Sequence, residues 1–165
     1  MAVEPSPANA ELLRRHLAWN GCNNVDVVEA AVADREGMVD FEFRPDPTDP
    51  GGFANSLAYG IGGEVASVKM TTLSCLCKEL TPELIKIDVE GAELLALRGA
   101  RELLMRAGPT IVIAIHPEPM RLLGTSPGEL ISFLGALGYS GRRLDGRAVV
   151  DPGFEEIIFE RQATT

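Results

Sequence analysis

The sequence predicts an α/β fold in which a mostly parallel β-sheet is covered on both faces by helices. Strand-like and helix-like segments alternate along most of the chain, and residues 111–115 form a continuous apolar run typical of a strand buried on both sides. The last two strand-like segments, separated by Asp145-Gly146, predict an antiparallel hairpin or a pair of edge strands. A length of 165 residues suits one domain with its own core, so we expect a single domain over residues 1–165.

The first half of the chain is expected to hold one main helix and three strands. After a short apolar stretch that ends at Val3, the helix opens at Pro7 and ends at Asn20-Gly21. Residues 44–64 are rich in proline, glycine and aspartate without any period, which predicts a long loop. The expected strands cover residues 25–32, 38–43 and 65–70, and a short helix is expected around residues 73–76.

The second half predicts the alternation more clearly. A strand at residues 84–89 leads into a helix at 91–107, which Gly108-Pro109 ends, and a strand follows at 110–116. Ser126 and Glu129 form a capping box with Pro127 at the first helical position, so a helix is expected from there to residue 137. The terminal antiparallel strands are expected at residues 139–144 and 154–160.

Composition and charge exclude several classes of protein. The net charge of −9 argues against a nucleic-acid-binding surface, which needs basic residues. No apolar run reaches the roughly 18 residues of a membrane span, and the N-terminus has no pattern of a secretory signal, so we expect a cytoplasmic protein without nucleic-acid or membrane partners.

The cysteines do not predict a metal site. Cys75 and Cys77 lie two apart, but Cys22 is the only other cysteine and no histidine lies nearby. We expect reduced thiols, with one member of the pair buried and the other exposed.

Chemically useful side chains follow several of the expected strands. Because ligands of open α/β sheets bind beyond the carboxyl ends of the strands, we expect a site at that edge. Its candidate residues are Glu4, Ala30, Ala31, Asp88, Glu90 and His116. A carboxylate in the position of Glu4 can accept hydrogen bonds from the ribose hydroxyls of a nucleoside, although a solvated residue near the terminus is the plainer interpretation.

Asp88 and Glu90 lie two residues apart, so they face the same way if the strand continues through them. Gly91 would then let the helix begin close to the sheet. Both carboxylates can simply stabilise the helix N-terminus, whereas Asp88 can also accept a proton from a substrate hydroxyl. His116, at the end of its strand, is expected to contact the substrate or accept a proton, with a purely structural role as the alternative. Asp88, Glu90 and His116 could also ligate a metal, but the sequence does not fix their separations, and we assign no metal site.

The segment Leu84-Ile-Lys-Ile-Asp-Val-Glu-Gly-Ala-Glu93, followed by Leu97-Arg-Gly-Ala100, closely resembles the hallmark of FkbM-type methyltransferases. Residues 3–21, with Glu4-Pro5 near their start, resemble the second motif of that family, and residues 27–37 resemble the third. The strand at 110–116 resembles the one that follows the hallmark. The resemblance runs from residue 1 to about residue 139.

This resemblance implies a Rossmann-like class I methyltransferase fold and transfer of a methyl group from S-adenosyl-L-methionine to a hydroxyl of a sugar or natural product. By analogy Glu4 and Pro5 would hold the ribose, Ala30 and Ala31 would lie near the adenine, and Asp88 would face the cofactor. Glu90 and His116 would lie toward the small-molecule acceptor, with Asp88, Glu90 and His116 as the catalytic candidates.

The chain departs from the family pattern at its start. In the family a first strand, a glycine-rich turn and a helix precede the position of Glu4, and here they are missing. The absent strand would lie centrally, between the strands that end at Glu4 and Asp88. Either the true start lies upstream, or the sheet has closed up, or a partner or a second copy fills the gap. The alternative function is a non-catalytic methyltransferase-like module. A nicotinamide-dependent oxidoreductase is a more remote alternative, since no G-x-G-x-x-G motif is present.

Overall fold

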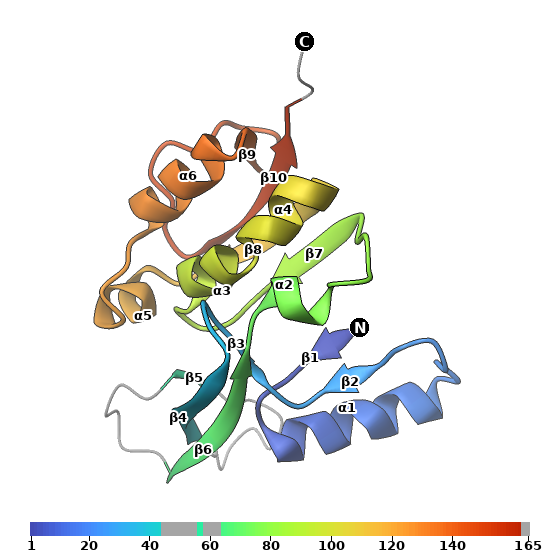
Figure 1. The fold of residues 1–165 in the computed structure, drawn as a ribbon. Helices are drawn as coiled ribbons and strands as arrows, with labels where there is room; N and C mark the ends of the chain where they lie inside the picture. Colours follow the sequence, from blue (N-terminus) through green and yellow to red (C-terminus); the bar gives the residue numbers. More distant parts are fainter. Residues whose placement is uncertain (44–55, 58–63, 163–165) are drawn as a thin grey trace.

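The computed structural model describes residues 1–43, 56–57 and 64–162 (Figure 1). The described strands form three sheets, with the orders β1-β2, β3-β6-β4-β5 and β7-β8-β10-β9. Their bounds are β1 (Ala2–Val3), β2 (Val27–Val28), β3 (Ala31–Val32), β4 (Gly37–Phe43), β5 (Ser56–Leu57), β6 (Glu64–Thr71), β7 (Leu84–Ile87), β8 (Thr110–Ile115), β9 (Tyr139–Arg143) and β10 (Glu155–Arg161). The helices are α1 (Pro7–Trp19), α2 (Leu73–Leu76), α3 (Glu93–Gly99), α4 (Arg101–Ala107), α5 (Pro117–Leu122) and α6 (Pro127–Ala136).

The helix boundaries set by local signals agree with the sequence. Ser6 caps α1 by accepting a hydrogen bond from the backbone N–H of Asn9, and Ser126 caps α6 by accepting one from Glu129. Gly108 ends α4 in the left-handed conformation. Because these signals act within one turn of the chain, the sequence alone was sufficient to place them.

The expected loop at residues 44–64 lies mostly outside the described residues. At its two described parts the expectation is wrong, because Ser56–Leu57 forms β5 and Glu64 already belongs to β6. Strand β4 pairs antiparallel with both β5 and β6, so part of the segment returns to the sheet that it was expected to leave.

The single strand expected at residues 25–32 is two short strands in the structure, so this expectation is wrong. Its first part is β2, which pairs parallel with β1, whereas its second part is β3, which pairs parallel with β6 in another sheet. The chain changes sheets at Glu29 and Ala30. This break leaves Ala30 and Ala31 buried where the two sheets approach each other.

Two expectations around the hallmark segment need correction. Strand β7 ends at Ile87, so Asp88 and Glu90 do not lie on a continuing strand, and the single helix expected at 91–107 is two helices that meet at Ala100. The strand expected at 110–116 ends at Ile115, and helix α5 follows it. Helix α5 was not expected, although Pro117 stands at its first position as helix-starting prolines commonly do.

The four-stranded sheet of β7, β8, β10 and β9 combines one parallel and two antiparallel pairings. Strand β7 is parallel to β8, and β10 inserts antiparallel between β8 and β9. The antiparallel pairing of the last two strands is therefore confirmed. One continuous, mostly parallel sheet is not observed in the described part of the chain, where the chain is instead a mixed α/β fold of separate sheets.

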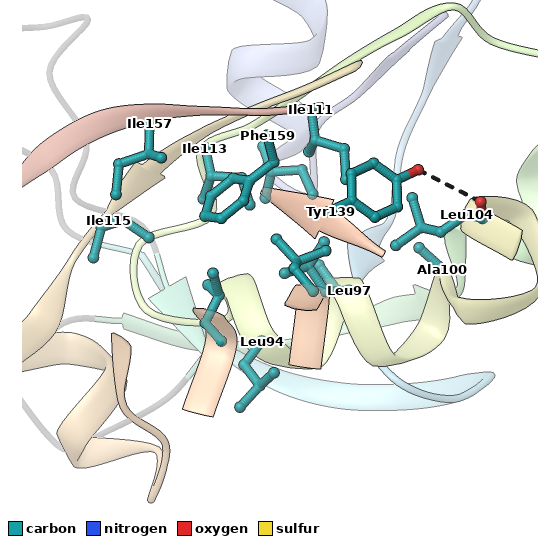
Figure 2. Close-up of a cluster of buried hydrophobic side chains, with 14 of the residues drawn as sticks. Leu94, Leu97, Ala100, Leu104, Ile111, Ile113, Ile115, Tyr139, Ile157 and Phe159 are labelled. Atoms are coloured by element: carbon teal, nitrogen blue, oxygen red, sulfur yellow. Dashed lines mark hydrogen bonds between the residues drawn. The ribbon is translucent and has the colours of Figure 1, made fainter. Parts of the chain in front are cut away.

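The main hydrophobic core lies between this sheet and its helices (Figure 2). Leu94 and Leu97 of α3 pack toward Ile113 of β8 and Phe159 of β10, and all four side chains are essentially unexposed. The Oη atom of Tyr139 donates a hydrogen bond of 3.4 Å to the carbonyl oxygen of Leu104, so the phenol remains satisfied inside the core. This core fixes α3, and therefore the segment that enters it, against β8.

A groove separates β1 from β7. It has a volume of about 620 Å³ and is lined by Ala2 and Val3 on one side and by all four residues of β7 on the other. Ala2 and Glu4 donate their N–H groups to β2, so the N–H of Val3 points away from that strand. Among the described residues, neither β1 nor β7 has a second strand neighbour, and the two free edges border the same groove.

None of the described helices has the length and apolar character that crossing a bilayer requires.

Candidate active site

A pocket of about 210 Å³ opens where the ends of β1, β3 and β7 approach one another. All five residues expected to bind the cofactor line it together: Glu4, Pro5, Ala30, Ala31 and Asp88. Glu90, Asn9 and Phe41 complete its polar and aromatic surface. These residues come from four separate parts of the sequence, and the structure brings them to one site as expected from the ends of parallel strands.

Glu4 is the carboxylate of this pocket. Its Oε1 atom accepts a hydrogen bond of 2.8 Å from the backbone N–H of Ser6, which holds the side chain against the start of α1. Burial raises the pKa of Glu4 above its ordinary value, although the hydrogen bond from Ser6 opposes this change. A half-buried carboxylate held in this way can accept hydrogen bonds from a ligand, so Glu4 is built into the wall of the pocket.

Asp88, Glu90 and His116 form a second cluster at the edge of the pocket. The Nε2 atom of His116 lies 3.8 Å from Oδ1 of Asp88 and 3.5 Å from Oε2 of Glu90. The His116 side chain is 6% exposed, whereas those of Asp88 and Glu90 are 51% and 38% exposed. The structure thus unites the three residues expected to be catalytic, with a buried imidazole facing two accessible carboxylates.

The backbone between β7 and α3 makes this meeting possible. Glu90 has a φ of 49° and is the one non-glycine residue with positive φ in the described part of the chain. Gly91 follows with a φ of 104°, and a Cβ atom there would lie 2.6 Å from Cβ of Pro119. The close approach that requires Gly91 is therefore to α5 rather than to the sheet, which corrects the expected reason for the glycine.

Sequence reasoning did not select Glu93, which fixes the orientation of His116. Glu93 has no exposed surface, and its Oε1 atom lies 2.8 Å from Nδ1 of His116 and accepts a hydrogen bond from the N–H of Gly91. Burial raises the pKa of Glu93, while the backbone hydrogen bonds and His116 oppose that change. The sequence did contain a signal for Glu93: it lies four positions before Leu97, so a charged residue falls on the apolar face of the helix.

Lys86 pairs with two carboxylates beside the cluster. Its Nζ atom lies 3.2 Å from Oδ2 of Asp88 and 2.8 Å from Oε1 of Glu156. Burial lowers the pKa of Lys86, but the hydrogen bonds to Glu156 and Asp88 outweigh burial and leave the pKa raised. Lys86 therefore holds Oδ2 of Asp88, and the other oxygen of that carboxylate, Oδ1, faces His116.

A further pocket of about 340 Å³ lies on the other side of the cluster. Asp88, Glu90 and His116 line it together with Phe154, Glu155 and Glu156. Phe154 is 79% exposed, and its ring packs edge-on against the imidazole of His116 with the ring centroids 5.0 Å apart. Sequence reasoning did not select Phe154 because nothing local distinguishes it from a strand residue.

The thiols are arranged as expected. Cys75 is exposed and Cys77 is buried, and burial raises the pKa of the Cys77 thiol. In the described part of the chain, Asp88, Glu90 and His116 form the only group of potential metal ligands, so no cysteine takes part in one.

Comparison with solved structures supports the fold. Methyltransferase FkbM from Methylobacillus flagellatus KT superposes with a TM-score of 0.58 and 18% sequence identity, over 96% of this chain and 35% of that chain. This chain therefore spans about a third of the length of that protein. No curated protein matches the chain.

The family comparison agrees with the motifs in the sequence. The FkbM methyltransferase domain matches residues 1–140, which include β1, the hallmark segment at β7 and all of the clustered residues from Glu4 to His116. This match covers most of the chain and confirms the resemblance noted from its sequence. The chain belongs to the FkbM methyltransferase family.

Proposed function

We propose that this chain carries the donor and acceptor sites of an S-adenosyl-L-methionine-dependent O-methyltransferase that acts on a hydroxyl of a small molecule. The observation that supports this most is the position of Asp88 and Glu90, which line both the pocket of Glu4 and the pocket of His116. A group-transfer enzyme needs its two substrates side by side, with the reacting atoms at the boundary between them.

The pocket of Glu4 has the chemistry that an adenosyl cofactor requires. Glu4 offers a carboxylate for the ribose hydroxyls, and the buried methyl groups of Ala30 and Ala31 with the ring of Phe41 offer an apolar surface for the adenine. The carboxylate of Asp88 suits the positively charged end of the cofactor. When bound there, S-adenosyl-L-methionine supplies a methyl group activated by its positively charged sulfur.

The pocket of about 210 Å³ is smaller than the roughly 300–1,000 Å³ usual for ligand sites. It shares Val3, Val32, Asp88 and Val89 with the groove between β1 and β7, so the two adjoin. We therefore infer that a cofactor would extend from the pocket of Glu4 into the groove, past Asp88.

The pocket of His116 would receive the acceptor. Transfer forms an oxygen–carbon bond and leaves the electron pair of the broken sulfur–carbon bond on sulfur, while the hydroxyl proton passes to the cluster of Asp88, Glu90 and His116. The exposed ring of Phe154 beside hydrogen-bonding carboxylates suits a sugar or a natural product with several hydroxyl groups. Positioning of the acceptor oxygen would supply most of the rate.

Calorimetry with S-adenosylhomocysteine tests the donor site. We expect binding to the wild-type chain and about 10- to 100-fold weaker binding to Glu4→Gln, because hydrogen bonds to a charged group contribute about 1.5–3 kcal/mol. Glu11→Gln is the control, since Glu11 is an exposed carboxylate on α1 that pairs with Arg15 outside the pocket. Equal affinities of wild type and Glu4→Gln would remove the assignment of Glu4.

The free edges of β1 and β7 favour a second candidate function, a methyltransferase-like module that becomes competent only after another strand fills the groove. Backbone groups of Val3 and of β7 face this groove, and an added strand would satisfy them. An absence of heat with either S-adenosyl-L-methionine or S-adenosylhomocysteine, in a chain with a cooperative unfolding transition, would favour the module. Binding by the chain alone would favour the enzyme.

A further inference from the structure

We propose that Asp88, Glu90 and His116 bind a divalent cation, through Oδ1, a carboxylate oxygen and Nε2 respectively. The three ligand atoms lie within 4.8 Å of one another. They come from two places in the sequence, the segment after β7 and the residue after β8, which the parallel pairing of those strands brings together.

The separations fit a cation in the middle better than direct contacts. Nε2 of His116 lies 3.5 Å from Glu90 and 3.8 Å from Asp88, and neither contact is a hydrogen bond. A cation about 2.1 Å from each of two ligand atoms holds them about 3.0–3.4 Å apart, for octahedral and tetrahedral angles respectively. The two contacts of His116 would close by less than about 1 Å, and the two carboxylates, which lie within 4.8 Å of each other, by up to about 1.8 Å. Both carboxylate side chains are partly exposed, so they can make this movement.

The buried imidazole is the observation that points to a ligand. His116 is enclosed, with its side chain 6% exposed, and Nε2 forms no hydrogen bond with any described residue while it faces the two carboxylates. Glu93 takes the other ring nitrogen at 2.8 Å, so a neutral His116 that donates from Nδ1 directs the lone pair of Nε2 at Asp88 and Glu90. A carboxylate behind a metal-binding histidine is the usual arrangement of outer residues around a metal site.

The pocket around the cluster is lined by acidic side chains. Four carboxylates line the pocket, those of Asp88, Glu90, Glu155 and Glu156. Arg143 binds both oxygens of Glu155, and Lys86 binds Glu156 and Oδ2 of Asp88. Lys86 and Arg143 thus hold three of the four carboxylates from the rim, while Oδ1 of Asp88 still faces Nε2 of His116.

One imidazole and two carboxylates suit cations that accept both nitrogen and oxygen, such as Mn²⁺ and Zn²⁺, better than they suit Ca²⁺. In the proposed methyl transfer, on which this use of the site rests, the cation would bind the acceptor hydroxyl and lower its pKa. With a cation bound, His116 would hold the cation rather than accept a proton, and the hydroxyl proton would pass to solvent water on the exposed side of Asp88 instead of to the cluster.

Mn²⁺ binding to the chelator-treated chain, followed by electron paramagnetic resonance, tests the site. We expect one bound Mn²⁺ per chain, with echo modulation from an imidazole nitrogen that disappears in His116→Ala. Asp88→Asn and Glu90→Gln should weaken binding at least tenfold, and Glu93→Gln should weaken it about 10- to 100-fold. His16→Ala and Glu118→Gln should leave binding unchanged, because His16 lies on α1 and Glu118 pairs with Arg121 on the exposed side of α5.

No bound Mn²⁺, or binding that Asp88→Asn and His116→Ala leave unchanged, would overturn the proposal. Because Asp88 is half exposed, its substitution remains informative even if His116→Ala does not fold. Calorimetry with S-adenosylhomocysteine separates the two proposals. Cofactor binding without Mn²⁺ binding removes only the metal site, whereas Mn²⁺ binding without cofactor binding keeps the site and removes the methyl transfer.

Discussion

Oε1 of Glu93 lies 2.8 Å from Nδ1 of His116, which links the first turn of α3 to the residue that follows β8. The carboxylate has no exposed surface, and the imidazole is almost fully enclosed. The contact fixes which ring nitrogen faces inward and leaves Nε2 toward Asp88 and Glu90. A buried ionisable pair is weak support for stability, so its value here is the orientation of Nε2 of the imidazole.

We therefore expect Glu93→Gln to lower the rate of methyl transfer about 10- to 100-fold in a catalytically active form of the protein, because the ring loses its carboxylate partner. The KM for the acceptor and the affinity for S-adenosylhomocysteine should change little, since Glu93 lines neither pocket. Steady-state kinetics measures the rate of methyl transfer and the KM for the acceptor separately. Glu102→Gln, an exposed carboxylate on α4, is the control, and a similar loss there would rule out a specific role for Glu93.

Gly91→Ala should destabilise the fold by about 1–3 kcal/mol more than Gly124→Ala. Both glycines have positive φ, so both alanine variants carry the backbone strain of the left-handed region. Only at Gly91 does the added Cβ atom meet a neighbour, at 2.6 Å from Cβ of Pro119, whereas nothing lies within 4 Å at Gly124. Urea unfolding of the two variants measures the difference, and equal losses would show that α5 moves away without cost.

Glu36 should make stability depend on pH in the acid range. Its carboxylate accepts hydrogen bonds from the N–H of Thr72 and the hydroxyl of Thr71, and these, the Thr72 bond first, hold the pKa of Glu36 below its ordinary 4.5. A lowered pKa in the folded state gives stability that is present above the unfolded value and lost as the pH falls through the folded value.

The difference in unfolding free energy between wild type and Glu36→Gln should therefore be constant above about pH 5 and shrink below pH 4.5. Urea unfolding between pH 3 and pH 7 measures it. Glu102→Gln again serves as the exposed carboxylate control. A difference that grows as the pH falls would contradict the proposed link between β4 and the end of β6.

The features that the sequence predicted correctly depend on neighbours in the chain. The helix start at Pro7, the cap at Ser126 and the stop at Gly108 are decided within one helical turn. The meeting of Glu4, Asp88 and His116 was also predictable, because the carboxyl ends of parallel strands share an edge. Their chemical roles stay predictions.

The features that the sequence did not predict depend on contacts between residues far apart in the chain. Nothing between residues 25 and 32 indicates that β2 pairs with β1 while β3 pairs with β6, because the partner strand decides where each half lies. The left-handed turn at Glu90 is similarly set by the packing of Gly91 against Pro119, about 28 residues later in the chain. The contact between Phe154 and His116 also depends on how β10 inserts beside β8.

Substitution of Leu84 tests whether the free edge of β7 is open to solvent or covered by another strand. The residue begins β7 beside the groove and is 61% exposed, although it belongs to a short strand of the kind that is usually buried between helices. If the edge is open in solution, Leu84→Lys should change the unfolding free energy by no more than about 0.5 kcal/mol. Leu97→Ala, in the core beneath the same sheet, should cost about 2–5 kcal/mol and calibrates the assay.

A covered edge gives the opposite result. If a second copy supplies a strand to the groove, Leu84 is buried in the assembly, and the urea midpoint of the wild type rises with protein concentration. Leu84→Lys would then cost well over 1 kcal/mol and abolish that rise, because a lysine on a strand edge opposes further pairing. A midpoint that is independent of concentration for both proteins would instead show that no second copy fills the groove between β1 and β7.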